Sequence, residues 1–139
     1  MIHEPNSFGT LDATFQAAGQ EDGIRRLVDC FYDIMEENPD YQRIRSWHPR
    51  NSEISRDKLA RFLCGWMGGP GRYQERYGPI SIPQAHRHLQ VTESEKDQWL
   101  SCMREALNRQ DYPEPLIEYL YAQLSLPAEA IRRACSASD

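Results

Sequence analysis

The chain has 139 residues, a formal net charge of −5 and a hydrophobic fraction of 40%. That length suits one compact domain with a core of its own. The acidic balance makes nucleic acid a poor candidate partner, and no apolar run approaches the roughly 18 residues that a membrane span requires. Because residues 1–10 lack the apolar core of a secretory signal, we expect a cytoplasmic protein.

The chain opens with an expected N-terminal arm over residues 1–20, which has room for one short turn of helix. The first long helix is predicted over residues 21–37, because apolar side chains recur there at helical spacing. These side chains are Ile24, Leu27, Val28, Phe31 and Met35. Asn38-Pro39 ends this helix, and a short helix over residues 41–46 leads into a bend at Trp47-His48-Pro49.

The second long helix is predicted over residues 55–67. Gly68-Gly69-Pro70 stops it, because Gly fits a left-handed cap and Pro cannot continue the helix. A connection over residues 68–83 follows, with four Gly, three Pro and no helical period. A loop of this length inside a small domain is usually functional. Pro83 then favours a short helix that carries His86 and His88.

The last third of the chain predicts two more helices and a tail. Thr92-Glu93-Ser94-Glu95 offers a capping box for a helix over residues 94–109. Its apolar stripe consists of Trp99, Cys102, Met103 and Ala106. A further helix follows Pro113, and Leu126-Pro127 is expected to bend the chain into a separate short helix that ends near residue 135. Residues 136–139 are expected to be a disordered tail.

The predicted fold class is all-α, with one globular domain over residues 21–135. Period-two alternation is nearly absent, so the helices must bury their apolar stripes on one another. The four cysteines are widely spaced and form no Cys-x-x-Cys pair. Neither structural zinc nor a disulfide framework is therefore expected.

Histidine is the residue type most relevant to metal chemistry, and the chain has four: His3, His48, His86 and His88. His86 and His88 would lie roughly 200° apart on a helix, so they cannot share one metal. His-Glu-x-x-His is absent, which disfavours a zinc hydrolase. A pairing of Ser55 with His48 as nucleophile and base lacks an oxyanion hole and an orienting acid. From the residues alone, His86 and His88 stay equal candidates for a single ligand.

Two polar aromatic residues lie at or near predicted apolar stripes. Tyr32 follows Phe31 at the edge of the first stripe, and Trp99 lies in the stripe of the third long helix. A buried phenol or indole N–H needs a hydrogen-bond partner. The partner is either a local group or a bound ligand, and the sequence chemistry does not choose between them.

An ordered set of motifs resembles the group II truncated haemoglobins and spans about residues 19–124. In chain order the set is Phe31-Tyr32, Trp47-His48-Pro49, Phe62-Leu63, Gly68-Gly69-Pro70, Tyr73, Gly78, His86 and Trp99-Leu100-x-Cys102-Met103. The resemblance implies a truncated globin, a two-over-two helical sandwich around haem. Because Cys-x-x-Cys-His is absent, the haem b would be held non-covalently.

The resemblance also implies roles for individual residues. His86 would be the proximal ligand of the iron, because neutral imidazole is a standard axial ligand. The distal hydrogen-bond donors would be Tyr32, Trp99 and His48, with Ser55 at the gate. The remaining haem contacts would be Leu59, Phe62 and Trp66, with Arg72, Tyr73 or Arg87 beside the propionates.

The implied function is reversible binding of dioxygen and other small diatomic ligands. The alternative is an enzyme at the same iron, which reduces peroxide or converts nitric oxide with dioxygen and is served by a reductase. The third possibility is a helical bundle without a cofactor. Two departures from the family stand out: Pro83 and Ala85 occupy places that are often basic, and His48 replaces an aromatic residue. A histidine there predicts pH-dependent ligand release between about pH 5.5 and 7.5.

Overall fold

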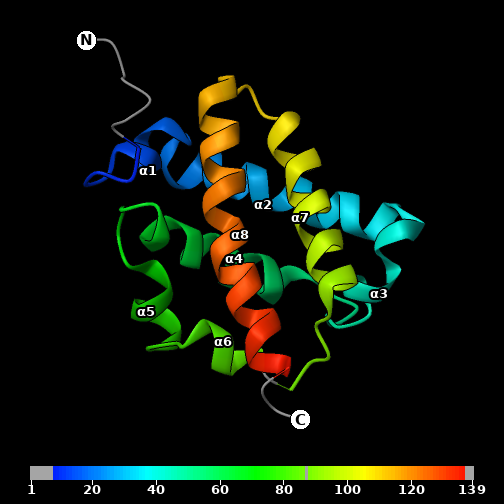
Figure 1. Cartoon of the computed structure of the whole chain (residues 1–139). Helices are drawn as coiled ribbons and strands as arrows, with labels where there is room; N and C mark the ends of the chain where they lie inside the picture. The colour runs from blue at the N-terminus through cyan, green and yellow to red at the C-terminus, as the bar shows by residue number, and fades with distance from the viewer. Residues whose placement is uncertain (1–7, 87, 137–139) are drawn as a thin grey trace.

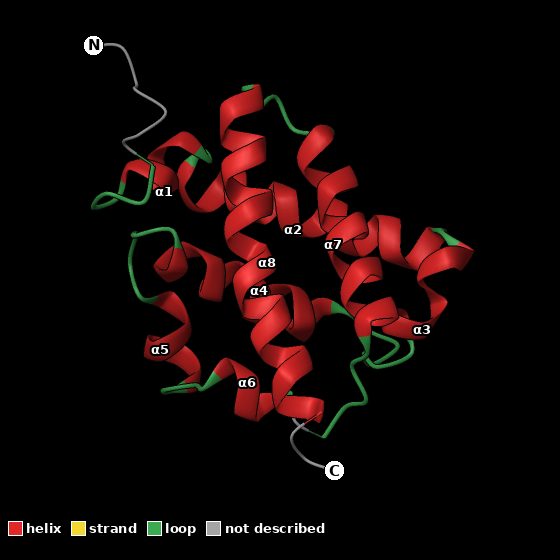
Figure 2. Cartoon of the chain, in the orientation of Figure 1, coloured by secondary structure: helices red, strands yellow, loops and turns green. Residues whose placement is uncertain are grey.

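The computed structural model describes residues 8–86 and 88–136, and every regular element in this part of the chain is helical (Figure 2). In chain order the elements are α1 (Ala13–Ala17), α2 (Gln20–Glu37), the 3-10 helix η2 (Pro39–Tyr41), α3 (Gln42–Arg45), α4 (Glu53–Trp66), α5 (Arg72–Tyr77), α6 (Ile82–Ala85), α7 (Glu93–Asn108) and α8 (Glu114–Ser136). The expectation of an all-α fold is confirmed.

The helices form two crossed pairs. α2 packs against α4, α7 packs against α8, and α2 also contacts α7. Figure 1 shows α7 and α8 as an antiparallel pair in front of α2 and α4, with the short helices α5 and α6 below α4. The core lies between the pairs and includes the fully buried Leu27, Phe31, Met103 and Leu120. This arrangement is the expected two-over-two sandwich.

The described part of the N-terminal segment packs onto the core. Phe15 and Ala18 are buried, and the Phe15 N–H donates to the carbonyl of Met67 at 3.1 Å. Gly23 allows the end of α1 to approach α2, because a Cβ there would lie 2.1 Å from the Ala18 carbonyl oxygen. Residues 1–7 of the expected arm, including His3, lie outside the described residues.

The connection after α4 differs from its prediction. α4 ends before Gly68 as expected, where φ is 92° and a Cβ would lie 1.9 Å from the Leu11 carbonyl oxygen. The expectation of a non-helical loop over residues 68–83 is wrong, because α5 lies within it. Six residues are too few to produce a periodic pattern, and α5 is held by tertiary contacts with α4.

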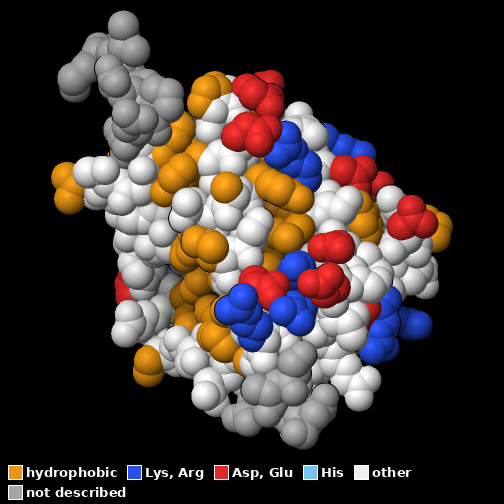
Figure 3. Space-filling view, viewed as in Figure 1, with side chains coloured by type: hydrophobic (Ala, Val, Ile, Leu, Met, Phe, Trp, Pro, Cys, Tyr) orange, Lys and Arg blue, Asp and Glu red, His pale blue; other side chains and the backbone are white. Residues whose placement is uncertain are grey.

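The start of α7 follows its prediction and the end of α8 does not. Thr92 and Glu95 form the expected capping box at the start of α7. α8 continues through Pro127, so the expected break into a separate helix is wrong. Lys96 of α7 pairs with Glu129 beyond the proline at 3.0 Å. Figure 3 shows basic and acidic side chains gathered together on the face of the molecule that α7 and α8 form. Packing against α7 and α6 offsets the backbone hydrogen bond that Pro127 cannot make.

No helix in the described part of the chain is long and apolar enough to span a membrane. Residues 137–139 of the expected tail lie outside the described residues, and Ser136 is the last residue of α8.

Candidate functional site

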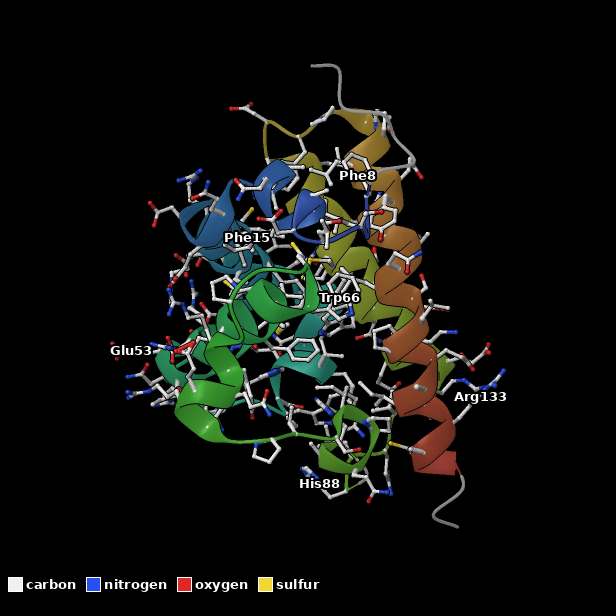
Figure 4. The ribbon with its side chains drawn as sticks, turned by 90° about the vertical axis from the view of Figure 1, so that its left-hand side faces the viewer. Phe8, Phe15, Glu53, Trp66, His88 and Arg133 are labelled. Carbon is white, nitrogen blue, oxygen red and sulfur yellow. The ribbon has the colours of Figure 1, made fainter. Side chains whose placement is uncertain are left out.

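His86 directly follows α6 and is half-buried. Its Nδ1 atom donates to the Ile82 carbonyl oxygen at 2.8 Å, since a carbonyl can only accept. The Nε2 lone pair is therefore free to bind a metal, as in most metal-ligating histidines, whose other nitrogen is held by a hydrogen bond. His88 is exposed at the lower end of the molecule in Figure 4. His86 is thus half-buried and oriented by a neighbouring carbonyl, whereas His88 is exposed.

His48 lies in the bend after α3 and has the same local arrangement. Its Nδ1 donates to the Ile44 carbonyl oxygen at 2.9 Å. Burial lowers the pKa of His48 despite this hydrogen bond, and the nearby Arg45 and His86 lower it further. The ring is therefore neutral at pH 7, and its Nε2 carries no proton. A donor role for His48 thus requires the protonated ring.

Tyr32 is buried on α2 beside His48, with the two rings edge-on and their centroids 5.4 Å apart. Burial raises the pKa of Tyr32 to about 12, although Arg56 and Arg45 act in the opposite direction. The phenol therefore keeps its proton at neutral pH and can donate it in a hydrogen bond. Within residues 8–86 and 88–136, no side chain or backbone group accepts a hydrogen bond from this hydroxyl.

Trp99 supplies a second donor from α7 and is half-buried. Its ring lies 5.2 Å from the ring of Phe31, which also lies 5.2 Å from the ring of Tyr32. Phe31 is therefore in contact with both donors, one from α2 and one from α7. The indole N–H also lacks a hydrogen-bond partner in the described part of the chain.

One face of α4 is left half-buried by the rest of the chain. Its residues recur at helical spacing and are Ser55, Leu59, Phe62 and Trp66. The opposite face is buried in the core through Ala60, Leu63 and Cys64. A cleft of about 360 Å³ borders the half-buried face and is lined in part by Phe62, Trp66 and Tyr73. Figure 4 shows Trp66 directed toward the interior of the molecule.

The candidate propionate partners have different surroundings. Arg72 lies 3.5 Å from Glu21 and 3.5 Å from Glu75, so two carboxylates already neutralise its charge. Arg87 lies outside the described residues. Lys58 and Arg76 both lie over the ring of Tyr77, and neither pairs with a carboxylate elsewhere in the described chain. These two cations are therefore more available to an anionic group than Arg72.

Two arginines that the sequence reasoning missed lie beside Tyr32 and the bend that carries His48. Arg56 lies 5.6 Å from the centre of the Tyr32 ring and pairs with Asp33 of α2 at 2.8 Å. Arg45 donates to three backbone carbonyls of the bend, those of His48, Pro49 and Arg50. The acidic residues Asp29, Asp33 and Glu36 recur at helical spacing in the sequence, and this pattern could have indicated a basic partner.

These residues fit a haem. The site offers a free imidazole nitrogen at His86 and two donors, Tyr32 and Trp99, that have no hydrogen-bond partner among the described residues. It also offers a half-buried and mostly apolar face on α4. A flat apolar cofactor would cover that face, and a polar ligand held near Tyr32 would satisfy the free donors. The arrangement can bind a small ligand that accepts hydrogen bonds.

Comparisons with known proteins agree with this fit. Residues 13–133 match the family of bacterial-like globins. The chain is 28% identical over 130 residues to the group 2 truncated haemoglobin YjbI of Bacillus subtilis. The matched region covers 94% of this chain and 96% of that protein.

Two solved structures extend the comparison to the fold. The cold-adapted truncated haemoglobin of the Antarctic bacterium Pseudoalteromonas haloplanktis superposes with a TM-score of 0.82, at 25% identity, over 85% of this chain and 95% of that one. The group II truncated haemoglobin of Bacillus anthracis gives a TM-score of 0.77, at 30% identity, over 85% and 88%. The family match covers most of the chain, and the chain therefore belongs to the bacterial-like globins, as a truncated haemoglobin of group II.

Proposed function

We propose that this chain binds haem b non-covalently through His86 and that it binds dioxygen and other small diatomic ligands reversibly. When bound, the haem supplies an iron atom with one open coordination position for the ligand. A solved relative from Bacillus subtilis is described as an oxygen-avid truncated haemoglobin, which supports a ligand of this kind. We also propose a cytoplasmic location and reduction by a separate reductase.

The observation that carries the proposal is the hydrogen bond from His86 Nδ1 to the Ile82 carbonyl oxygen. It holds the ring in one orientation, with the Nε2 lone pair free. It also makes the imidazole a stronger donor to iron, because the Nδ1 proton is shared with an acceptor. Among the described residues, no carbonyl orients the exposed His88 in this way. His48 has an equivalent hydrogen bond, but its ring lies against the ring of Tyr32, where we propose that the ligand binds.

The distal side is proposed to stabilise the ligand through Tyr32 and Trp99. Both are donors without a partner in the described part of the chain. Tyr32 is protonated at neutral pH, and burial raises its pKa further, from 10 to about 12. A ligand that gains partial negative charge would be held by these two groups. His48 would accept through Nε2 at neutral pH and would donate only in acid. Ser55 and Leu59 would border the same space from α4.

The test compares the two histidines near α6. His86→Ala should abolish the haem Soret band of the reconstituted protein, whereas His88→Ala should retain it, because only His86 has an oriented Nε2. Spectra of the ferric, ferrous and oxygen-exposed protein then report ligand binding. Retention of a normal Soret band and Fe–His Raman band in His86→Ala would overturn the assignment of the ligand. The absence of haem binding by the wild-type chain would overturn the function.

A further inference from the structure

Asp57 of α4 joins three helices through one carboxylate. It accepts hydrogen bonds from the Tyr77 hydroxyl of α5 at 2.7 Å, from Arg25 of α2 at 3.0 Å and from Arg61 of α4 at 2.9 Å. Only 24% of the Asp57 side chain is exposed. We refer to Asp57, Tyr77, Arg25 and Arg61 as the α4–α5 latch. None of the four was singled out by the sequence analysis.

The latch has a charged acceptor at neutral pH. Burial alone would raise the pKa of Asp57, but the hydrogen bonds from Tyr77, Arg25 and Arg61 lower it below its ordinary value. A hydrogen bond to an ionised carboxylate is about twice as strong as one between neutral groups. The bond from Tyr77 is therefore a strong link between α4 and α5.

Apart from the latch, α5 contacts α4 through half-buried or exposed side chains, among them Lys58, whose Nζ lies 5.4 Å from the centre of the Tyr77 ring. Helix α5 contains no buried residue. The Tyr73 ring meets Phe62 of α4 edge-on at 6.5 Å and lies 5.1 Å from the Tyr77 ring. Its ion pair to α2, between Arg72 and Glu21, joins two side chains that are both more than one third exposed. Such pairs contribute little to stability, so the position of α5 depends strongly on Tyr77.

The latch lies at the start of the segment that leads to His86. Tyr77 is the last residue of α5, and the next residue, Gly78, has a φ of 82°. Residues 78–81 form no regular structure, and α6 contains no buried residue. On the other side, α6 is held by its contacts with α8. The place of α6 beneath α4 is thus fixed from two sides, by α8 and by the end of α5.

We propose that Asp57 and Tyr77 are positioning residues that hold α5 against α4 and would thereby help to retain the cofactor and to orient His86. The proposal rests on the proposed haem function. Opening of the Asp57–Tyr77 bond would free α5 to swing away from the cleft that Phe62 and Tyr73 line. Haem loss would then proceed through this side of the molecule, while the distal donors on α2 and α7 stay in place.

The experiment measures transfer of haem from the ferric holoprotein to excess apomyoglobin. Tyr77→Phe removes one hydroxyl and keeps the ring, so folding should be retained. We expect haem loss to accelerate about five- to thirty-fold, the effect of losing one hydrogen bond to a charged acceptor. In the same variant, hydrogen exchange should accelerate in α5 and the Fe–His Raman band should shift, because both report the position of the proximal segment.

Tyr41→Phe is the matched control. The Tyr41 hydroxyl also donates to a carboxylate, that of Glu105 at 2.5 Å, but it joins η2 to α7. Haem loss in Tyr41→Phe should stay within about twofold of wild type. In an Asp57→Asn background, Tyr77→Phe should add much less than it does alone, because the two residues share one interaction.

The outcomes separate the latch from the function on which it rests. An unchanged rate of haem loss in Tyr77→Phe, or an equal acceleration in Tyr41→Phe, would overturn the latch while haem binding by the wild type still stands. Additive effects of Tyr77→Phe and Asp57→Asn would overturn their action through one bond. Failure of the wild-type chain to bind haem would overturn the proposed function instead.

Discussion

The two sides of the candidate site are built differently. The proposed distal donors Tyr32 and Trp99 lie on α2 and α7, two long helices whose inner faces are buried in the core. His86 follows α5 and α6, two short helices that bury no residue. The positions of the proposed distal donors therefore depend on the packing of the whole domain core. The proximal side is fixed by a few local contacts and, on the proposed function, by the cofactor itself.

The largest expected effect is on the distal side. Phe31 is fully buried and supports the rings of both Tyr32 and Trp99. Phe31→Ala should lower the free energy of unfolding by about 3–5 kcal/mol, because it removes a large side chain from a close-packed core. Denaturant unfolding of the cofactor-free protein measures this loss.

Phe62→Ala makes the same change as Phe31→Ala, but on the face of α4 that borders the cleft. Phe62 is only half-buried in the chain itself, so its removal should lower the free energy of unfolding of the cofactor-free protein by no more than about 1–2 kcal/mol. Its effect should appear instead in a faster loss of haem. Equal destabilisation by the two substitutions would contradict the contrast between the two sides.

The next effect tests the distal donors without disturbing the core. Tyr32→Phe removes a hydroxyl that has no partner in the described chain, so the free energy of unfolding should change little. The rate of oxygen dissociation should rise about ten- to hundred-fold, the loss of one hydrogen bond to a ligand with partial charge. Stopped-flow oxygen displacement measures the rate, and Tyr41→Phe serves as the control that leaves it unchanged.

The same contrast explains what the sequence could predict. α2 and α7 were foreseen because their stripes and the capping box at Thr92 are local patterns that packing reinforces. α5 was missed because its helix depends on Tyr77 meeting Asp57, twenty residues earlier in the chain. His86 and His88 could not be separated by spacing, because the difference depends on the Ile82 carbonyl and on where α6 ends.

Long-range contacts also explain why α8 continues through Pro127. The local rule that proline breaks a helix predicted an end to α8, and packing overrode it. The roles of Arg45 and Arg56 likewise depend on which residues fold against them. Sequence reasoning thus reached the elements and the chemical residue types of the site, whereas the side chains that hold them in place depend on tertiary contacts.

A smaller effect concerns the pH dependence of ligand release. The pKa of His48 is lowered from its ordinary value of 6.5, chiefly by burial and to a smaller extent by the neighbouring Arg45 and His86. His48 is therefore neutral above pH 6.5 and gains a proton, and with it a donor at Nε2, only as the pH falls below that value. Oxygen dissociation should slow by up to about fivefold in acid, because a further donor reaches the ligand. The change in the rate of oxygen dissociation should thus be centred below about pH 6.5, the middle of the range from about 5.5 to 7.5 that the sequence predicted.

His48→Phe tests this pH dependence. Oxygen dissociation is measured from pH 5 to 8 in both proteins, and the acid slowing should disappear in the variant. Protonation of His48 also opposes folding, since its pKa is lower in the folded chain than its ordinary value of 6.5. Its contribution to stability is therefore complete above pH 6.5 and declines as the pH falls through the folded pKa. Coincident rate profiles would remove His48 from the distal chemistry.

The smallest effect compares two contacts of the segment that carries His86: the thiol of Cys135 on α8 and the hydroxyl of Tyr77 on α5. The Cys135 thiol of α8 donates to the His86 carbonyl oxygen at 3.4 Å, and a thiol is a weak donor. Cys135→Ala should therefore change the rate of haem loss by less than about twofold, far below the effect expected for Tyr77→Phe. The comparison decides which neighbour positions His86. If Cys135→Ala accelerates haem loss as much as Tyr77→Phe, the proximal segment is held from α8, and the bond between α4 and α5 is only one of several equal contacts.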